Sequence, residues 1–255
     1  MILDPGKKIY FVSDVHLGAS ALSDNPRRER LFADWLEEIS ADAQMVFLMG
    51  DIFDFWFEYR KVVPRGFTRV LGRIAGLTDN GIPVHFFTGN HDVWVFDYLP
   101  RETGVILHRD FFTIELSGRK FFLAHGDGLD KDDIGYLLLK KIFTSRVLQW
   151  LFARLHPNFA FEIAHRWSKN SRLAKKSEGQ EFVAENEGMY RYALSVLEKE
   201  HFDYFVFGHR HRLVNREMPG NSRFILLGDW IKSFSYGVFD GEKFELLKYK
   251  PKFTR

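Results

Sequence analysis

The sequence predicts an α/β protein made of one large domain with an insertion. Short, fully apolar runs alternate with segments of helical spacing, and several of the runs end in a polar cluster. The chain has 255 residues, of which 45% are apolar and 27% charged, values typical of a globular domain with a substantial core. It contains no cysteine, which excludes a disulfide framework, thiolate catalysis and Cys-ligated metal sites.

The first half of the chain alternates predicted strands and helices. Residues 9–12 form a short apolar run that predicts a buried strand, and residues 28–39 carry large apolar side chains at helical spacing. A second strand is predicted at 45–49, a helix at about 66–79 and a third strand at 84–87. Continuous apolar runs separated by helices favour parallel strands that are covered on both faces.

The second half changes character after residue 104. We expect short strands in quick succession, a long helical region, a further helix and strand, and an antiparallel tail with a hairpin turn at Asp240-Gly241. The expected bounds are 105–108, 111–116 and 120–124 for the strands, 132–176 for the helical region, 180–199 for the helix, 203–207 for the next strand, and 223–227, 234–239 and 243–248 for the tail. The core is therefore predicted to comprise residues 1–131 and 177–255, with 132–176 as the insertion.

Five of the predicted strands end in a cluster that contains Asp, Asn or His. In open α/β sheets the carboxyl ends of the strands form the ligand crevice, and a Gly beside a polar residue lets the chain turn sharply. We therefore expect the side chains of these clusters to converge. The clusters are Asp14-Val15-His16, Gly50-Asp51, Gly89-Asn90-His91-Asp92, His125-Gly126-Asp127 and Gly208-His209-Arg210-His211.

The clustered residues predict a site for two divalent metal ions, because Asp, Asn and His suit hard or borderline cations. Asp14 and His16 are two residues apart, and in an extended segment such residues point the same way. His209 and His211 have the same spacing, and Asp51 has two oxygens with which to bridge two ions. The predicted ligands are Asp14, His16, Asp51 and His211 for one ion, and Asp51, Asn90, His125 and His209 for the other.

These five clusters, in this order, resemble the calcineurin-like metallophosphoesterases, whose pattern is D-x-H, G-D, G-N-H-D, a lone His and G-H-x-H. The resemblance implies a mixed α/β (α+β) fold, namely a four-layer αββα sandwich. It also implies that Asp51 bridges the two ions. Two such ions clamp a phosphoryl group and activate water near neutral pH. Manganese is the expected metal, with iron, zinc and magnesium as alternatives.

The same resemblance assigns roles to residues beside the ligands. It implies that His91 is not a ligand but faces the phosphate with Asn90, where it stabilises developing charge and protonates the leaving oxygen. Asp92 is expected to orient His91. Asp54 and Asp127 are either further ligands or, as we expect, partners behind the ligands or turn caps.

Further segments extend the resemblance over nearly the whole chain. They are Gly50-Asp51-Ile52-Phe53-Asp54-Phe55-Trp56, His125-Gly126-Asp127-Gly128-Leu129, Asp132-Asp133, Gly135-Tyr136, Trp150-Leu151-Phe152, Lys169-Asn170-Ser171 and Leu227-Gly228-Asp229-Trp230. They resemble the UDP-2,3-diacylglucosamine pyrophosphohydrolases of lipid A synthesis, which release UMP and 2,3-diacylglucosamine 1-phosphate. That family has a helical lid that holds the acyl chains. The resemblance implies substrate contacts by Asn90, His91, Asp133, Tyr136, Ser171, Lys175, Lys176 and His209.

The charge of the insertion fits a lipid-linked sugar nucleotide. Residues 138–176 contain nine Lys or Arg and one acidic residue, so this segment carries +8 and the rest of the chain −6 (27 − 33). Apolar side chains recur every three or four residues between the basic ones, which suits acyl chains beside a diphosphate or anionic headgroups. The alternative is an ordinary helical pair with a solvated basic face. Nucleic acid is not an expected partner, because no binding motif accompanies the basic residues.

The expected location is the cytoplasm, with transient peripheral contact to the inner membrane of a bacterium. No apolar run reaches the roughly 18 residues that span a bilayer, and the N-terminus carries no signal-peptide pattern.

Three features depart from the narrower family. It has Arg at the place of His91, Cys-Thr at Asp130-Lys131 and Arg at Ser168. Because His91 is typical of general phosphoesterases, a phosphodiesterase or pyrophosphatase acting on another nucleotide or lipid-linked phosphate is the alternative. A non-catalytic binding scaffold is disfavoured, because every ligand position is filled.

Overall fold

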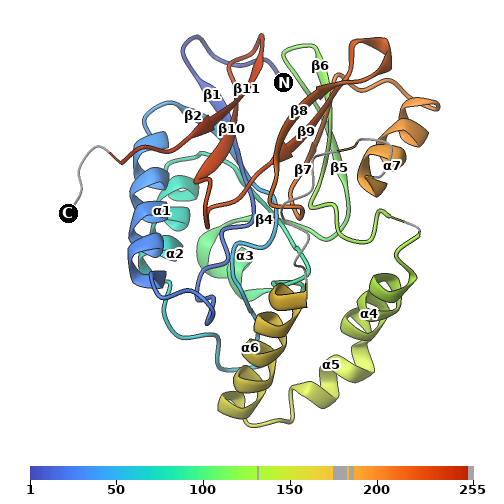
Figure 1. The fold of residues 1–255 in the computed structure, drawn as a ribbon. Helices are drawn as coiled ribbons and strands as arrows, with labels where there is room; N and C mark the ends of the chain where they lie inside the picture. Colours follow the sequence, from blue (N-terminus) through green and yellow to red (C-terminus); the bar gives the residue numbers. More distant parts are fainter. Residues whose placement is uncertain (131, 175–182, 184–186, 252–255) are drawn as a thin grey trace.

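The computed structural model describes residues 1–130, 132–174, 183 and 187–251, with the side chains at 165 and 169–174 left out of the description. Two β-sheets pack face to face, and helices cover the outer face of each sheet (Figure 1). The predicted four-layer αββα sandwich is therefore confirmed. The helices of the predicted insertion stand together at one end of the sandwich (Figure 1).

The first sheet has six strands in the order β11-β10-β1-β2-β3-β4. Its parallel part is confirmed, and the hairpin of β10 and β11 extends it antiparallel to β1. The strands are β1 (Lys8–Val12), β2 (Ala43–Leu48), β3 (Val84–Phe87), β4 (Ile106–His108), β10 (Ser235–Phe239) and β11 (Phe244–Lys248).

The second sheet has five strands in the order β5-β6-β7-β9-β8, which are β5 (Phe112–Leu116), β6 (Arg119–Ala124), β7 (Tyr204–Phe207), β9 (Arg223–Leu227) and β8 (Leu213–Glu217). The prediction that 223–227 belongs to one antiparallel tail is wrong. This strand, β9, lies parallel to β7 in the second sheet, while the rest of the tail joins the first sheet. Strand β8 was not predicted, because its residues are mostly polar and exposed at the sheet edge.

Helices α1 (Asn25–Ile39), α2 (Thr68–Asp79) and the short α3 (Tyr98–Thr103) cover the first sheet, and α7 (Gly188–Leu197) covers the second. The predicted helix at 180–199 is shorter than expected in its described part, and most of 180–187 lies outside the described residues. Helix α3 was not predicted because one and a half turns leave too little periodicity to detect. The predicted helical region contains α4 (Ile134–Thr144), α5 (Arg146–Phe152) and α6 (Pro157–Ala174).

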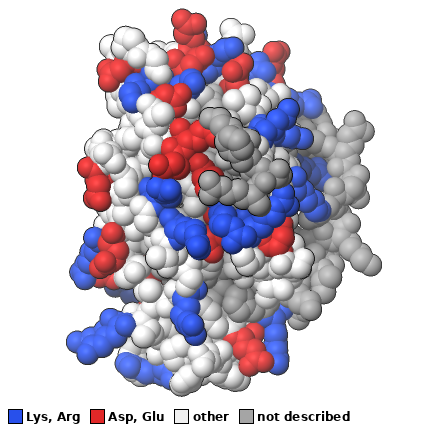
Figure 2. Space-filling view, turned by 90° about the vertical axis from the view of Figure 1, so that its left-hand side faces the viewer, with Lys and Arg blue, Asp and Glu red and all other residues white. Residues whose placement is uncertain are grey.

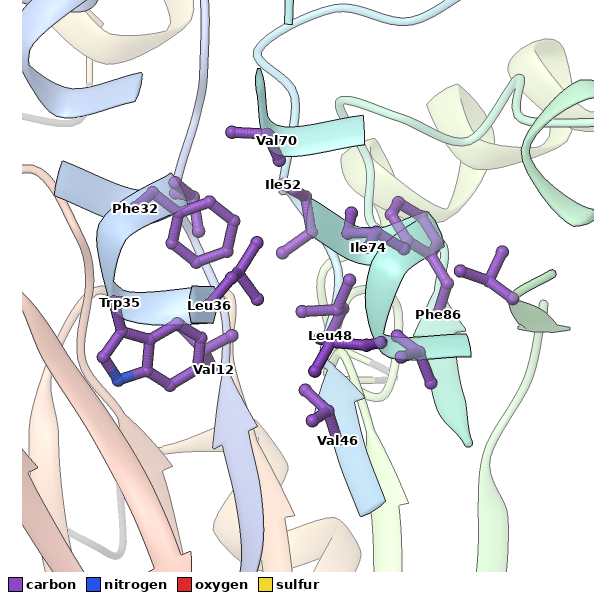
Figure 3. Close-up of a cluster of buried hydrophobic side chains, with 14 of the residues drawn as sticks. Val12, Phe32, Trp35, Leu36, Val46, Leu48, Ile52, Val70, Ile74 and Phe86 are labelled. Atoms are coloured by element: carbon purple, nitrogen blue, oxygen red, sulfur yellow. The ribbon is translucent and has the colours of Figure 1, made fainter. Parts of the chain in front are cut away.

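Both faces of the first sheet are buried, which explains the continuous apolar runs. On β1, Tyr10 and Val12 face the helices, whereas Ile9 and Phe11 face the second sheet. Figure 3 shows the layer between the first sheet and helices α1 and α2, where Val12 lies near Phe32, Trp35 and Leu36. Truncating a buried aromatic side chain of this kind to Ala destabilises a protein by about 3–5 kcal/mol.

The outer surface of the first helical layer carries charges of both signs. Figure 2 shows Lys and Arg side chains interspersed with Asp and Glu on the face that lies at the left of Figure 1. One ion pair there joins Arg73 of α2 to Glu37 of α1. Such exposed pairs contribute at most about 1 kcal/mol, so the apolar layers hold the helices in place. No described helix combines the length and apolar character needed to cross a membrane.

A buried histidine pair links β3 to β4 and predicts pH-dependent stability. His85 Nδ1 lies 2.8 Å from His108 Nε2. Burial, and then the nearby His108, lower the pKa of His85 to about 4. Between pH 6.5 and 4 the unfolded chain therefore binds more protons than the folded one, and the free energy of unfolding falls as the pH falls through this window.

We expect wild type to lose about 1–2 kcal/mol more than a His85→Phe variant between pH 7 and 4, because its neighbour His108 is only half-buried and solvent weakens the effect. Phe is a suitable replacement because rings of Phe47 and Phe112 surround the position. Urea unfolding at several pH values measures the difference. Equal losses in the two proteins would contradict this origin.

Candidate active site

The predicted polar clusters meet at one end of the sandwich. There the carboxyl ends of the strands that precede the clusters lie close together. Strands β1, β2 and β3 of the first sheet and β6 and β7 of the second each lead into one cluster. Hydrogen bonds connect the two sheets here, since the His209 N–H donates to Asp14 Oδ2 at 2.8 Å and the Trp230 N–H donates to the Asp14 carbonyl oxygen at 3.1 Å. Each sheet thus supplies part of one site.

The first group of ligand atoms comes from Asp14, His16 and His211, which lie within 4.8 Å of one another. His211 Nε2 is 3.5 Å from Asp14 Oδ1 and 3.3 Å from His16 Nε2. The spacing of these atoms around a common centre fits one cation held by a carboxylate and two imidazoles.

The second group comes from Asp51, His125 and His209. Asp51 Oδ2 is 3.4 Å from His125 Nε2 and 3.7 Å from His16 Nε2, so this oxygen faces both groups. The other oxygen, Oδ1, accepts a hydrogen bond from the His91 N–H at 2.8 Å. Asp51 therefore lies between the two groups of candidate ligand atoms.

The backbone of the ligand loops differs from the expectation. We expected Asp14 and His16 to share a direction because the segment is extended, but both have a positive φ, +55° and +47°. His209 and His211 also do, at +66° and +53°, and so does Asp51 at +53°. Left-handed conformations of non-glycine residues are uncommon and concentrate at functional sites. The tight loops, and not strand geometry, bring these side chains together.

Gly89 allows the loops to approach this closely. A Cβ atom at this position would overlap Oδ1 of Asp51 and lie 2.7 Å from the Asp51 backbone nitrogen. Only a residue without a side chain fits against Asp51.

Three buried polar atoms in the site have no hydrogen-bond partner within the described part of the chain. They are Asp14 Oδ1, Asn90 Oδ1 and His125 Nε2. Buried polar atoms are almost always satisfied, so their convergence requires explanation. Divalent cations at the site would explain it, since all three atoms belong to residues predicted as ligands. The His125 ring is held by a contact of 2.8 Å between Nδ1 and the Met49 carbonyl oxygen, which leaves Nε2 for an ion.

The electrostatics of the site also favour cations. Burial alone would raise the pKa values of Asp14 and Asp51, but the neighbouring histidines hold both below the usual range. Burial opposes a charge on His125, yet the Asp51 carboxylate raises the pKa of His125 to about 10. The carboxylates thus create a strongly negative field at the ligand atoms, which divalent ions would offset.

Asp92 plays a different part from the one predicted. Its carboxylate does not orient the His91 ring; it accepts hydrogen bonds from the N–H groups of Gly89 at 2.7 Å and Ile52 at 2.8 Å. Burial, and then the charge of Asp51, raise the pKa of Asp92 to about 7. Asp92 therefore fixes the two loops that carry Asp51 and Asn90.

Asp54 is the residue that orients His91. The His91 Nδ1 atom lies 2.9 Å from the Asp54 carbonyl oxygen, and Asp54 Oδ1 is 3.3 Å from His16 Nδ1. The Ser168 hydroxyl of α6 donates to Asp54 Oδ2 at 3.0 Å. Asp54 thus lies behind His16, as expected, and attaches α6 to the site. His91 itself lies within 4.8 Å of the ligand atoms of His16 and Asp51.

Comparison with known proteins agrees with this geometry. The family profile described as Calcineurin-like phosphoesterase matches residues 7–213. The chain belongs to the calcineurin-like phosphoesterase family. It is accordingly a hydrolytic enzyme, and the family implies divalent metal ions at the site just described.

Two relatives of this phosphoesterase are named UDP-2,3-diacylglucosamine hydrolase. The protein from Porphyromonas gingivalis is 43% identical over 92% of this chain and 94% of its own. The protein from Actinobacillus succinogenes is 30% identical over 88% of this chain and 92% of its own. Among solved structures, an archaeal phosphodiesterase aligns over 94% of this chain and 98% of its own, with 15% identity and a TM-score of 0.46.

Two residues of the phosphoesterase site had no predicted role. Arg28 of α1 is buried and donates hydrogen bonds to the carbonyl oxygens of Val15 and His16, at 2.8 and 2.9 Å. Asp229 Oδ2 lies 3.8 Å from His211 Nδ1. A Gly-Asp pair after a strand marks Asp229 in the sequence, whereas nothing in the local sequence distinguishes Arg28 from other helical arginines.

Among the predicted substrate residues in the insertion, the side chains of Asp133 and Tyr136 are described by the structure, whereas the others are not. Asp133 is exposed and caps α4 by accepting from the Tyr136 N–H, and the Tyr136 hydroxyl donates to Asp127 at 2.8 Å. Asp127 also pairs with Lys140, so it lies beside the ligands and not among them. Lys175 and Lys176, and the side chain of Ser171, lie outside the described residues.

Proposed function

We propose that this phosphoesterase hydrolyses the diphosphate of UDP-2,3-diacylglucosamine, releasing UMP and 2,3-diacylglucosamine 1-phosphate in lipid A synthesis. The names of the two relatives support this substrate. The observation that carries the proposal is an apolar cavity of about 310 Å³ that opens beside Asn90 and His91. A site for soluble nucleotides alone has no need of such a cavity.

The apolar cavity lies between the site and helices α4–α6. Its walls include Phe55, Trp94, Phe143, Phe152 and Trp167. These rings contact one another, for example Trp94 with Phe152 at 5.1 Å between centroids. Large apolar pockets with a few polar groups at one end are typical ligand sites, and this one suits an acyl chain whose polar end lies at the metal centre. In this proposal the predicted insertion, 132–176, acts as the lid.

The ligand residues would hold two divalent ions, which supply charge compensation for the phosphate and an activated water. Manganese is the proposed metal, because the ligands are imidazoles, carboxylates and an amide oxygen without sulfur. Asn90 places its amide beside the position of the phosphate. Asp92 and Asp54 keep the surrounding loops in place.

His91 stabilises the charge that develops on the phosphate in this proposal. Burial lowers the pKa of His91, so the ring is neutral in the absence of substrate. An anionic phosphate beside the ring acts in the opposite direction and favours the protonated form. With Nδ1 directed to the Asp54 carbonyl oxygen, Nε2–H then faces the phosphate as a donor.

The direct test is incubation of the manganese-loaded protein with UDP-2,3-diacylglucosamine and with UDP-glucose, with UMP as the measured product. We expect kcat/KM to favour the diacylated substrate by more than about tenfold, since even two buried methylene groups contribute about 0.8 kcal/mol each. The alternative substrate is a soluble nucleotide diphosphate. The presence of His91, which is typical of general phosphoesterases, supports this alternative. Equal turnover of the two substrates would support that alternative and reject the lipid.

We also propose transient contact between helix α5 and the cytoplasmic membrane surface, where a diacylated substrate resides. Val147, Trp150 and Leu151 are between 50 and 68% exposed, and the Arg154 guanidinium lies 4.6 Å above the Trp150 ring. Exposed apolar side chains next to basic ones are typical of helices that bind anionic bilayers.

Trp150→Ala should weaken binding to vesicles that contain anionic lipid by about tenfold, because one aromatic side chain contributes about 1.5–3 kcal/mol when buried. Phe111→Ala is a matched control. Phe111 is exposed to a similar extent, 55%, but it lies next to β5 and is not part of α5. Vesicle co-sedimentation measures both. Equal binding of wild type and Trp150→Ala would refute the contact.

A further inference from the structure

A second cavity, of about 330 Å³, borders the metal centre on another side of the same loop. Its walls include Gly89 and Asp127 next to the ligands, and Phe96, Arg109, Lys140 and Arg146 further away. The apolar cavity instead contacts Asn90 and His91. The loop 89–91 therefore lies between two cavities of different chemistry, each adjoining the position of the phosphate.

The second cavity carries an excess of positive charge. Lys140 pairs with Asp127 at 2.8 Å, and this carboxylate is the acidic side chain on the wall. Neither Arg109 nor Arg146 makes an ion pair with any residue that the structure describes. Three cations on the wall thus outnumber the carboxylates of Asp127 and of Glu58, whose charge acts on Arg109, and this favours an anionic ligand.

Arg109 is placed for recognition of a planar polar group. One of its nitrogens donates to the Val95 carbonyl oxygen at 2.7 Å, and its guanidinium carbon lies 5.9 Å from the centroid of the Phe96 ring. Burial lowers the pKa of Arg109, so this cation is partly desolvated. Its remaining N–H groups can donate hydrogen bonds to a ligand. An aromatic face beside a guanidinium suits a pyrimidine base, whose flat ring stacks and whose carbonyl oxygens accept hydrogen bonds.

We propose that this cavity binds the nucleotide half of the substrate, the pyrimidine nucleoside 5′-monophosphate that hydrolysis releases. The inference rests on the proposed function, since it gives a bipartite substrate one cavity for each half. Phe96 and Arg109 face the base, while Lys140 and Arg146 supply positive charge toward the ribose and the phosphate. Arg109 and Arg146 are thereby specificity residues for the nucleotide.

The test is the affinity of the manganese-loaded protein for UMP, measured by calorimetric titration. We expect Arg109→Lys, Phe96→Leu and Arg146→Ala each to raise the Kd for UMP about tenfold, while the Kd for 2,3-diacylglucosamine 1-phosphate changes less than twofold.

Lys141→Ala is the matched control, because Lys141 is exposed on α4 and lines neither cavity. Inorganic phosphate should bind equally to wild type, Arg109→Lys and Phe96→Leu, since these residues face the base. Thermal melting identifies variants that fail to fold, and Arg146→Ala replaces an exposed side chain that makes no ion pair with a described residue.

The outcomes separate this inference from the proposed function. If UMP affinity is unchanged in Arg109→Lys, Phe96→Leu and Arg146→Ala, the nucleotide assignment is overturned even where the diacylated substrate is hydrolysed. A selective loss of affinity for the lipid phosphate would also overturn it. If UMP binding depends on these residues but the diacylated substrate is not turned over, the nucleotide cavity stands and the lipid substrate falls.

Discussion

Asp51→Asn should abolish hydrolysis, with a loss of about 10³-fold or more in kcat/KM. Asp51 Oδ2 faces both ligand groups, so the substitution removes the one negative charge that both ions would share. An amide oxygen is a weaker ligand, and the transition-state stabilisation of several kcal/mol attributed to a two-ion site depends on both ions. Metal analysis should show fewer than two ions bound per chain, and activity should fail to recover at high manganese.

Asp97→Asn is the appropriate control for Asp51→Asn. Asp97 is largely exposed and pairs with Arg101 one turn away, so its loss should change kcat/KM less than twofold. Undiminished metal-dependent turnover by Asp51→Asn would rule out the two-ion assignment as a whole.

Gly89→Ala should reduce kcat/KM by about 10²–10³-fold although it adds only a methyl group. The new Cβ would overlap Asp51 Oδ1, so Asp51 must move, and a displacement of about 1 Å in a catalytic group is enough for a loss of about 10²-fold. The same shift disturbs the hydrogen bond from the His91 N–H to Asp51. Overpacking should also lower the free energy of unfolding by about 1–3 kcal/mol.

Gly72→Ala tests whether the effect belongs to the site. Gly72 lies within α2, and a Cβ there meets no atom within 4 Å. This variant should keep full activity and gain up to about 1 kcal/mol in unfolding free energy. A Gly89→Ala protein with normal manganese affinity and normal turnover would show that Asp51 is not held as closely as the structure indicates.

The convergence of polar clusters could be predicted because it depends on local sequence. Each cluster follows a strand within a few residues, and the carboxyl ends of parallel strands lie at one edge. The order and spacing of the clusters then indicated the calcineurin-like phosphoesterase family. Because the fold of that family contains two sheets, the sandwich could be predicted as well. The pattern of apolar residues alone could not distinguish one sheet from two, because the central strands of either sheet are buried on both faces. Strand β9 shows the limit: its pairing with β7 joins segments that no local signal connects.

The conformation of the ligand loops could not be predicted from spacing. Residues two apart are expected to point the same way in extended chain, yet Asp14 and His16 are both left-handed. The contacts that hold this conformation come from distant segments, such as Arg28, whose guanidinium binds two carbonyl groups of the loop. A lone buried arginine becomes meaningful only when the packing of α1 against that loop is known. The role of Asp92 was missed for the same reason, since its partners are backbone groups of another loop.

The division of ligands between two sheets has a consequence for how the protein is made. His16 and His211 are neighbours in the site but 195 positions apart in the chain. During synthesis on a ribosome, the strands that carry Asp14, Asp51 and Asn90 emerge long before those that carry His125, His209 and His211. The nascent chain can therefore pair β1 to β4 of the first sheet while one of the four predicted ligands of one ion, and two of the four of the other, are still untranslated. A complete set of predicted ligands therefore exists only after β7 has been made, and a chain that stops short of β7 lacks His209 and His211.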